Sequence, residues 1–354
     1  MIIPGKLFLW TASKLYGAAV AVRNGLYDMG LLRSLEFDVP VICTGNITAG
    51  GTGKTPHVIW LAEKLSARAG VAVLSRGYLR KSRGFMAVTP DSTAADAGDE
   101  PLLMARSLSQ AKVFVDRDRV NGIREILSTF PETGTVVMDD GFQHRAVRAG
   151  MYIILTDWGR LMTRDRLLPL GLLREPVHAV RRADIVIVTK TPGDITMSVM
   201  EQVRNELTTA GAGDSIFFTT LAYDSPRQLF TEKITAIGRN TSVLLVTGIA
   251  NPAPMTEYLG KIAGNITHLP FPDHHAYTVA DISKITSAFD AMSGPDKIIV
   301  TTAKDGVRLK EITIIADHVR QALHYLPVRV QFIEDEDVFL NKIYSYAGKD
   351  YQNR

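Results

Sequence analysis

The sequence predicts an α/β protein in which helices flank a parallel sheet and a second, smaller α/β domain follows. Two observations predict this fold class. Short runs rich in β-branched residues alternate with stretches of helical periodicity, which is typical of parallel strands joined by crossover helices. The alternation begins again after the polar, glycine-containing stretch 208–214, which indicates a second unit.

The predicted elements follow in chain order. In the first series, strands are expected at 39–44, 71–74, 112–115, 135–138, 152–155 and 184–189, and helices at 58–68, 100–108 and 120–130. In the second series, strands are expected at 215–221, 242–246, 297–301 and 328–332, and helices at 254–262, 279–291 and 336–346. We therefore expect a helical N-terminal segment at 1–37, a core domain at 38–210 and a smaller α/β domain at 211–354.

The composition is that of a folded globular protein. The 354 residues are 46% hydrophobic and 22% charged, and a chain of this length usually exceeds one hydrophobic core. The net charge is only +3 and no long Lys/Arg block occurs, so nothing indicates nucleic acid as a partner. The single cysteine, Cys43, excludes an intrachain disulfide and a cysteine metal cluster, which fits a reducing compartment.

A glycine-rich loop follows the first predicted strand and ends in Gly53-Lys54-Thr55, directly before a helical pattern. Strand, glycine loop and helix in this order are the context of a P-loop, whose backbone N–H groups and helix N-terminus bind phosphate. We therefore expect the core domain to have the parallel sheet of a P-loop NTPase and to bind ATP.

The P-loop residues have distinct expected roles. Lys54 would reach the β- and γ-phosphates, and the Thr55 hydroxyl would ligate Mg²⁺. The usual first glycine of the motif is replaced by Thr48, and a glycine-rich turn with an accidental Gly-Lys-Thr is the alternative interpretation. The expected nucleotide-binding residues of the loop are Thr48, Ala49, Gly50, Gly51, Thr52, Gly53, Lys54 and Thr55.

An apolar run at 135–138 ends in two carboxylates, Asp139 and Asp140. Acids at the end of a strand beside a P-loop hold Mg²⁺ or its water ligands in nucleotide-binding proteins. We expect Asp139 and Asp140 to be catalytic metal ligands, together with Thr55.

A phosphoryl transfer to an alcohol also requires a group that takes the hydroxyl proton. The candidates are Asp99 and the acid-imidazole run Asp273-His274-His275. Each has a plainer alternative, because Asp99 is also placed to cap a helix and histidines on a loop are often only surface residues.

Taken together and in order, these motifs resemble the tetraacyldisaccharide 4'-kinase family, the lipid A 4'-kinases. The matching segments are 44–55, 75–78, 98–101, 118–120, 139–144, 168–175, 273–274 and 302–305. The resemblance implies transfer of the ATP γ-phosphate, with Mg²⁺, to the 4'-hydroxyl of a tetraacylated glucosamine disaccharide 1-phosphate. It implies a peripheral protein of lipid A biosynthesis at the cytoplasmic face of the bacterial inner membrane.

The same resemblance implies roles for individual residues. Asp99 corresponds to the general base and His274 to its partner from the second domain, which contributes to the active-site cleft. Before 168–175 the family commonly has a Phe-Gly-Asn-Gly type turn, whereas this chain has the arginine-rich stretch 159–166, so contacts made by that turn are not carried over. The nucleotide and phosphate region would include Arg174 and Glu175, and the acceptor's sugar or 1-phosphate would contact Arg76, Tyr78 and Arg119.

The N-terminal segment 1–37 is basic and apolar at once, with Lys14 and Arg23 among many leucine and aromatic residues. Its longest uninterrupted apolar or small stretch, 15–22, is far shorter than the ~20 residues needed to cross a bilayer. We expect an amphipathic, membrane-associating helix, while docking of the same helix on its own domain remains the alternative.

Other functions remain open at this stage. A P-loop kinase of another small hydroxyl acceptor fits the same loop, because a P-loop does not specify its acceptor. A P-loop GTPase or ATPase switch protein fits less well, since Thr189-Lys190 begins the guanine-binding motif but Pro192 stands where aspartate is needed. A non-enzymatic membrane-binding protein is disfavoured by the intact Lys54-Thr55 and Asp139-Asp140.

Overall fold

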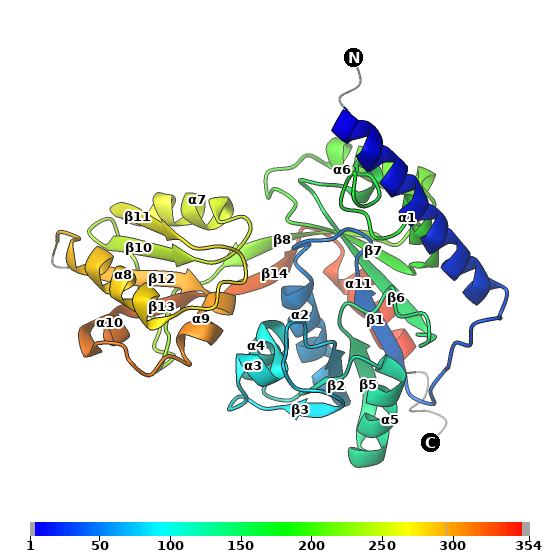
Figure 1. Ribbon diagram of the computed structural model, residues 1–354, viewed down its shortest axis with the longest axis horizontal. Coiled ribbons are helices and arrows are strands. Elements are labelled where there is room, and N and C mark those ends of the chain that lie inside the picture. Colours follow the sequence, from blue (N-terminus) through cyan, green and yellow to red (C-terminus); the bar gives the residue numbers. More distant parts are fainter. Residues whose placement is uncertain (1–3, 295, 349–354) are drawn as a thin grey trace.

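The computed structural model describes residues 4–294 and 296–348, which form two α/β units connected by a pair of long strands (Figure 1). The large unit contains a nine-stranded sheet with the order β14-β8-β7-β6-β1-β5-β2-β4-β3. Its strands are β1 (Val41–Gly45), β2 (Gly70–Ser75), β3 (Met86–Val88), β4 (Lys112–Val115), β5 (Thr133–Met138), β6 (Met151–Asp157), β7 (Ile185–Thr189), β8 (Ile216–Tyr223) and β14 (Val328–Phe332). All neighbours pair in parallel except β3 and β14, which lie antiparallel at the two edges.

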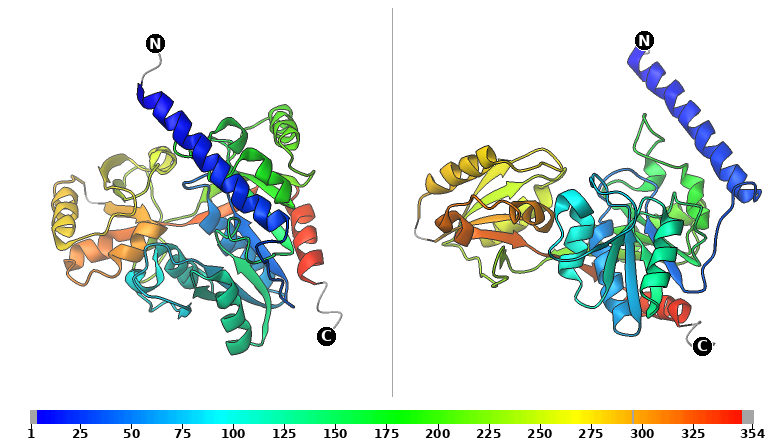
Figure 2. Two further views of the ribbon diagram at one scale, coloured as in Figure 1. Left: turned by 45° about the vertical axis from the view of Figure 1, so that its right-hand side comes forward. Right: turned by 60° about the horizontal axis from the view of Figure 1, so that its bottom comes forward.

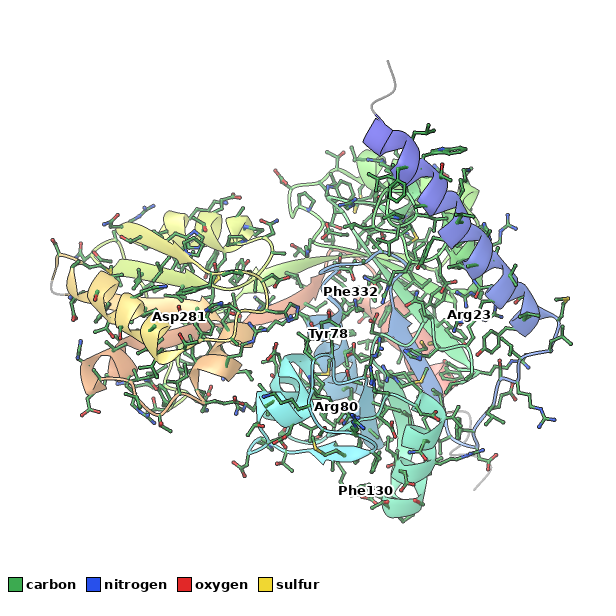
Figure 3. The ribbon with its side chains drawn as sticks, viewed as in Figure 1. Arg23, Tyr78, Arg80, Phe130, Asp281 and Phe332 are labelled. Atoms are coloured by element: carbon green, nitrogen blue, oxygen red, sulfur yellow. The ribbon has the colours of Figure 1, made fainter. Side chains whose placement is uncertain are left out.

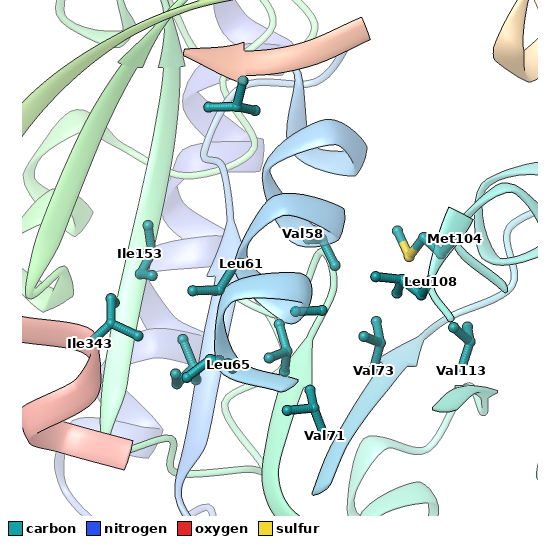
Figure 4. Packing of buried hydrophobic residues seen from close by; sticks show 14 of the residues in the cluster. Val58, Leu61, Leu65, Val71, Val73, Met104, Leu108, Val113, Ile153 and Ile343 are labelled. Atoms are coloured by element: carbon teal, nitrogen blue, oxygen red, sulfur yellow. The ribbon is translucent and has the colours of Figure 1, made fainter. Parts of the chain in front are cut away.

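Helices cover both faces of the large sheet, because parallel strands that are apolar on both faces must be buried on both. They are α1 (Pro4–Asp28), α2 (Lys54–Ser66), α3 (Ala94–Ala97), α4 (Asp99–Ser107), α5 (Arg119–Thr129), α6 (Met197–Thr209) and α11 (Glu336–Ala347), with 3₁₀ turns η1 (Met162–Arg164) and η2 (Val177–Arg182). Figure 4 shows Val58, Leu61 and Leu65 of α2 packed on the large sheet, in one core cluster with Val73 and Ile153. This packing fixes the N-terminal end of α2, which carries the P-loop.

The small unit has its own five-stranded sheet and its own core. Its strands are β9 (Arg227–Gln228), β10 (Ser242–Thr247), β11 (Asn265–Pro270), β12 (Lys297–Thr302) and β13 (Leu323–Leu326), in the order β11-β10-β12-β13-β9. Its helices are α7 (Ala253–Ile262), α8 (Val279–Asp290), α9 (Ala303–Leu309) and α10 (Asp317–Ala322). Buried residues such as Leu244, Ile285 and Phe289 pack within this unit and not against the large sheet.

The boundary between the units differs from the predicted one at 210. Strands β8 and β14 pair with each other and belong to the large sheet, and α11 packs on that sheet as well. The small unit is therefore an insertion between β8 and β14 and does not extend over the whole of 211–354. The glycines at 211 and 213 mark the turn between α6 and β8, which is internal to the large unit. Residues 349–354 of the predicted domain lie outside the described range.

Helix α1 lies against the large unit (Figure 2), and polar contacts along one side dock it there. The Tyr16 hydroxyl donates to the Arg174 carbonyl at 2.9 Å, and the Asn24 amide donates to the Glu175 carboxylate at 2.9 Å. Both partners lie in the segment 168–175 that the sequence analysis singled out, so α1 contacts the neighbourhood of the P-loop.

The other sides of α1 carry apolar side chains that face solvent. Phe8 is 72% exposed and Leu15 is 70% exposed, and Trp10 and Val22 are also largely exposed. One side of the helix therefore packs on its own domain, and association of its exposed apolar side with a membrane stays a prediction. Within the described ranges, no helix is long and apolar enough to cross a bilayer. Residues 1–3 of the predicted N-terminal segment lie outside the described range.

The packing of α11 predicts a large effect of one substitution on stability. Phe339 is buried, and its ring centroid lies 4.9 Å from that of Phe332 and 5.7 Å from that of Trp60. We expect Phe339→Ala to lower the free energy of unfolding by about 3–5 kcal/mol, because it removes a buried ring and leaves a cavity. Urea denaturation followed by circular dichroism measures this. The neighbouring Val338 is 49% exposed, so Val338→Ala is the matched control and should change the free energy of unfolding by less than about 0.5 kcal/mol. Equal losses in the two variants would contradict the buried packing of Phe339.

Candidate active site

The P-loop connects β1 to α2 at the carboxyl end of the large sheet. Gly50 has φ 111° and Gly53 has φ 79°, values that residues with a side chain rarely adopt. Lys54 and Thr55 follow as the first residues of α2. The expected order of strand, glycine loop and helix is present, and it directs the first N–H groups of α2 toward the space where a phosphate would bind.

The beginning of the P-loop is held by the segment 168–175. The Ala49 N–H donates to the Leu172 carbonyl at 2.6 Å, and the Arg174 N–H donates to the Ile47 carbonyl at 2.6 Å. Thr48 lies between these bonds and forms an antiparallel bridge with Leu173. Position 48 is therefore an extended, buried residue, which explains why this chain does not require glycine there.

The two acids at the end of β5 lie beside the P-loop. Asp139 is 2% exposed; its Oδ2 accepts a hydrogen bond from the Ser75 hydroxyl at 2.8 Å, while its buried Oδ1 has no hydrogen-bond partner within the described part of the chain. Asp140 accepts two bonds from the Arg174 guanidinium, at 2.8 and 3.1 Å, and lies 3.5 Å from the Lys54 ammonium. One acid is thus left with an open buried oxygen, and the other is shared by two cations.

The surroundings shift the pKa values of Asp139 and Asp140 in opposite directions. Burial raises the pKa of Asp139, and the nearby charges of Glu100 and Asp140 raise it further. Burial alone would also raise the pKa of Asp140, but Lys54 and Arg174 outweigh this effect and hold that pKa well below its usual range. Asp140 is therefore an anion that fixes Lys54 beside the loop, and Asp139 is a buried carboxyl group whose ionised form a further cation would stabilise.

These residues fit a hexacoordinate, oxygen-binding cation such as Mg²⁺. The open Oδ1 of Asp139 is the oxygen such an ion needs, and Asp140 and Thr55 come from the adjacent strand end and helix start. Across residues 4–294 and 296–348 there is no group of three or more His, Cys, Asp or Glu arranged to hold a metal. Mg²⁺ commonly binds through one or two carboxylates plus substrate phosphates, so this site would be completed only by a nucleotide.

The structure brings Asp99 and His274 together across the two units. Gly98, at φ 90°, turns the chain into α4, and Asp99 is the first residue of that helix. His274, in the loop after β11, adopts a positive φ of 57° and places its Nδ1 3.5 Å from Asp99 Oδ2. Non-glycine residues in this backbone region are uncommon and gather at functional sites. The proximity that the family resemblance implied is thus present in the geometry.

The predicted acceptor contacts fall in different environments. Arg76 and Tyr78 follow β2 and are exposed, and Figure 3 shows Tyr78 between the two units. The Tyr78 ring lies edge-on to His274 with 5.9 Å between ring centroids. Arg119 is 2% exposed and donates to the Asp139 carbonyl at 3.2 Å. Arg119 therefore supports the backbone of the acidic strand end, and its contact with an acceptor stays a prediction.

The hydrogen bonds of Glu175 go to α1 and η2. Its Oε2 accepts from Arg182 at 2.6 Å as well as from Asn24 of α1. Glu175 is buried and connects α1 to η2, so in this arrangement it stabilises the packing of α1 beside the site. Arg174, its neighbour in sequence, points to Asp140 beside the P-loop, as the prediction of a phosphate-side residue requires.

Three cationic residues near the site were not assigned to it from the sequence. Lys190 donates to the Gly51 carbonyl of the P-loop at 2.5 Å. Lys304 and Arg308, both on α9, contact the region of Asp99 and His274. Their spacing of four residues places both on one face of a helix, which is a detectable signal, but the sequence does not show what that face contacts.

A buried histidine connects the P-loop to a strand that links the two units. His57 Nδ1 lies 2.8 Å from the Gly53 carbonyl oxygen, and its Nε2 lies 2.9 Å from the Thr219 hydroxyl of β8. The carbonyl only accepts, so Nδ1 carries the proton and Nε2 accepts from Thr219. Burial lowers the pKa of His57 to about 4.

This histidine predicts a pH dependence of stability. The folded-state pKa lies below the value of about 6.5 in an unfolded chain, so the unfolded state binds the proton more tightly. Stability is therefore lost as the pH falls from about 6.5 to about 4, by roughly 3 kcal/mol for this group, since one pKa unit corresponds to about 1.4 kcal/mol. We expect His57→Gln to show a smaller loss of unfolding free energy over this window, measured by urea denaturation at several pH values. His318→Gln, at an exposed histidine, is the control and should leave the slope unchanged; the same slope in wild type and His57→Gln would be inconsistent with a buried neutral ring.

Known proteins of one family are similar to this chain over nearly its whole length. A family model described as Tetraacyldisaccharide-1-P 4'-kinase matches residues 5–347. A Bacteroides thetaiotaomicron protein named tetraacyldisaccharide 4'-kinase is 40% identical over 359 residues, which cover 98% of this chain and 94% of that protein. A protein of the same name from Flavobacterium johnsoniae is 40% identical, with 96% of each chain covered. The crystal structure of LpxK from Aquifex aeolicus in complex with ATP superposes with a TM-score of 0.74 at 29% identity, covering 96% of this chain and 99% of that one.

These matches confirm the predicted fold class and the resemblance drawn from the motifs. The chain belongs to the tetraacyldisaccharide-1-P 4'-kinase family.

Proposed function

We propose that this chain transfers the γ-phosphate of ATP to the 4'-hydroxyl of a tetraacylated glucosamine disaccharide 1-phosphate, a step of lipid A biosynthesis. The observation that carries the proposal is the convergence of a P-loop, two strand-end carboxylates and the Asp99–His274 pair between the two units. Family membership supports the acceptor, and the Aquifex aeolicus relative, whose structure is titled as a complex with ATP, supports the donor.

The P-loop side of the site would bind the triphosphate. Backbone N–H groups of the loop and the Lys54 ammonium would contact phosphate oxygens, and Arg174 would stay on Asp140. Asp139, Asp140 and Thr55 would hold Mg²⁺, which neutralises charge on the β- and γ-phosphates when it is bound. Phosphoryl transfer requires mainly positioning and charge stabilisation, so this part of the site supplies most of what the reaction needs.

The opposite side of the site would handle the proton of the acceptor hydroxyl. We assign this role to Asp99 as the base with His274 as its partner, as the family resemblance implies. Burial alone would raise the pKa of Asp99, but bonding to Arg308 and the charges of Arg308 and Lys304 lower it overall. Asp99 is therefore ionised at neutral pH, which a carboxylate needs in order to accept a proton or to orient a neighbouring imidazole.

Helix α1 and its surroundings fit a lipid acceptor at a membrane surface. The exposed Phe8, Trp10 and Leu15 provide an apolar side, and basic residues such as Lys14 favour anionic headgroups. A groove of about 720 Å³ lies between α1 and the segment 165–178. Leucine and small residues form much of its lining, so it suits an apolar chain. These features support a peripheral protein at the cytoplasmic face of the bacterial inner membrane.

The direct test is transfer of radiolabelled γ-phosphate from ATP, with Mg²⁺, to tetraacyldisaccharide 1-phosphate in detergent micelles, with products resolved by thin-layer chromatography. We expect a labelled lipid, and we expect Lys54→Ala to reduce it by about 100-fold or more, because the lost ammonium stabilises charge on the transferring phosphoryl group. Lys190→Ala serves as a comparison, since the Lys190 ammonium is held by the Gly51 carbonyl and, at 2.6 Å, by the Asp157 carboxylate. Absence of labelled lipid from protein that folds and binds ATP would redirect the proposal to another hydroxyl acceptor.

Substitution of the two residues that meet between the units tests the assignment of the base. We expect Asp99→Ala and His274→Ala each to lower kcat by about 100-fold or more, the usual scale for general acid-base groups, with little change in ATP affinity. His275→Ala is the control, because His275 binds Asp281 at 2.9 Å within the small unit. Near-normal turnover in both Asp99 and His274 variants would refute the assignment.

A further inference from the structure

Helix α9 of the small unit directs two cations at the Asp99–His274 pair. The Lys304 ammonium lies 3.2 Å from His274 Nε2 and donates to the Glu100 carboxylate at 3.1 Å. The Arg308 guanidinium is 8% exposed; it bonds to Asp99 Oδ2 and lies 3.4 Å from His274 Nδ1. Both nitrogens of the His274 ring therefore face charged groups of known hydrogen-bonding character.

The donors and acceptors around the ring favour one of its two neutral tautomers. An ammonium group donates hydrogen bonds and accepts none, so His274 Nε2 must accept from Lys304 and cannot carry a proton. The ring proton is then on Nδ1, where the available acceptor is Asp99 Oδ2 at 3.5 Å. Arg308 is also only a donor, so the two cations compete for the one acceptor nitrogen of a neutral ring. We assign that nitrogen to the closer cation, Lys304, because the Asp99 carboxylate lies beside Nδ1 and can accept its proton.

We propose that Lys304 is a positioning residue that holds His274 in the tautomer with its proton on Nδ1, directed at Asp99. This inference deepens the proposed function and rests on it for its catalytic consequence. The tautomer of a histidine is set by the hydrogen bond at its other nitrogen, and a ring with the opposite tautomer would turn a bare nitrogen toward the Asp99 carboxylate. Lys304 thereby sets the proton arrangement of the pair without touching the reacting atoms.

The frame around Lys304 is rigid enough for this role. Asp305, its neighbour on α9, is fully buried and accepts from the Gly248 N–H at 2.9 Å and from Arg308 at 3.2 Å. The His274 N–H in turn donates to the Gly248 carbonyl at 3.1 Å. Helix α9 and the His274 loop are thus bonded to the same residue, Gly248, which keeps the distance between Lys304 and the imidazole within the small unit fixed.

The ring nitrogens of His274 report the proposal directly. In protein labelled with ¹⁵N-histidine, long-range ¹H–¹⁵N correlation spectra at pH 8 distinguish a protonated Nδ1 from a protonated Nε2, and the signals that vanish in His274→Asn belong to this ring. We expect wild type to carry the proton on Nδ1. We expect Lys304→Met, which keeps the length of the side chain but donates no hydrogen bond, to shift His274 toward the Nε2-protonated tautomer. Lys304→Arg, which retains a donor, should restore the wild-type pattern.

Kinetics add the catalytic consequence. We expect Lys304→Met to lower kcat about 10- to 100-fold with little change in KM for ATP, and Lys304→Arg to recover much of the loss. Lys310→Met is the matched control, because Lys310 is also in the small unit and pairs with Glu232, at 3.8 Å. If Lys304→Met does not fold, Lys304→Gln replaces it, because glutamine keeps a hydrogen-bond donor without the charge. We expect His274 to keep its proton on Nδ1 in Lys304→Gln. The Nε2-protonated tautomer in that variant would count against the proposal.

The spectroscopic and the kinetic experiments distinguish a failure of this inference from a failure of the proposed function. A His274 ring with its proton on Nε2 in wild type, or a tautomer that is the same in wild type and Lys304→Met, overturns the role of Lys304 whatever the acceptor is. If wild type does not phosphorylate the lipid but the tautomer responds to Lys304 as expected, the proposed function fails and the positioning contact stands.

Discussion

The ionised carboxylate of Asp140 is the interaction on which the arrangement of the phosphate side depends. It accepts two bonds from Arg174 and lies 3.5 Å from Lys54, so a single anion joins the strand end β5, the segment 168–175 and the start of α2. The Asp140 side chain is 36% exposed, so water screens its charge in part and the loss of one cation costs less than it does in a fully buried ion pair. Because Arg174 binds Asp140 through two nitrogens, Lys54 is able to move to an incoming phosphate without leaving Asp140 unpaired. A P-loop lysine with a single anionic partner and no second cation would lack this freedom.

The contacts of the P-loop also explain how a chain with an incomplete motif keeps the loop in shape. Thr48 occupies the usual glycine position as an extended residue bridged to Leu173. The backbone hydrogen bonds from Ala49 and Arg174 on either side of this bridge join the loop to the segment 168–175. The loop is therefore shaped by a neighbouring segment and not only by its own glycines. Glycine remains necessary where φ is positive, at Gly50 and Gly53.

Local signals were sufficient to predict the P-loop side of the site, and long-range contacts limited the rest. Lys54 and Asp139 could be identified because each follows an apolar strand, and parallel strands bring their carboxyl ends to one edge of the sheet. Asp99 and His274 came together only through a family resemblance, since nothing local links a helix start to a distant loop. The domain boundary at 210 failed for a related reason, because β8 and β14 have the pattern of strands in either unit and only their pairing shows that both belong to the large sheet. Lys304 and Arg308 share one helix face, yet the sequence does not show that this face meets α4.

The division of the proton-handling groups between two units has a consequence for the fate of ATP. Asp99 and Glu100 belong to the large unit with the P-loop, whereas His274, Lys304 and Arg308 belong to the small unit. Any separation of the units takes the imidazole away from Asp99 while the nucleotide stays on the P-loop. A water molecule that reached the γ-phosphate in such a separated state would meet no complete base, so hydrolysis of ATP would be disfavoured until the units come together around an acceptor. The ion pair between Arg308 and Asp99 favours the assembled state, because separation takes Asp99 away from the Arg308 guanidinium, which keeps Asp305 as its partner within the small unit.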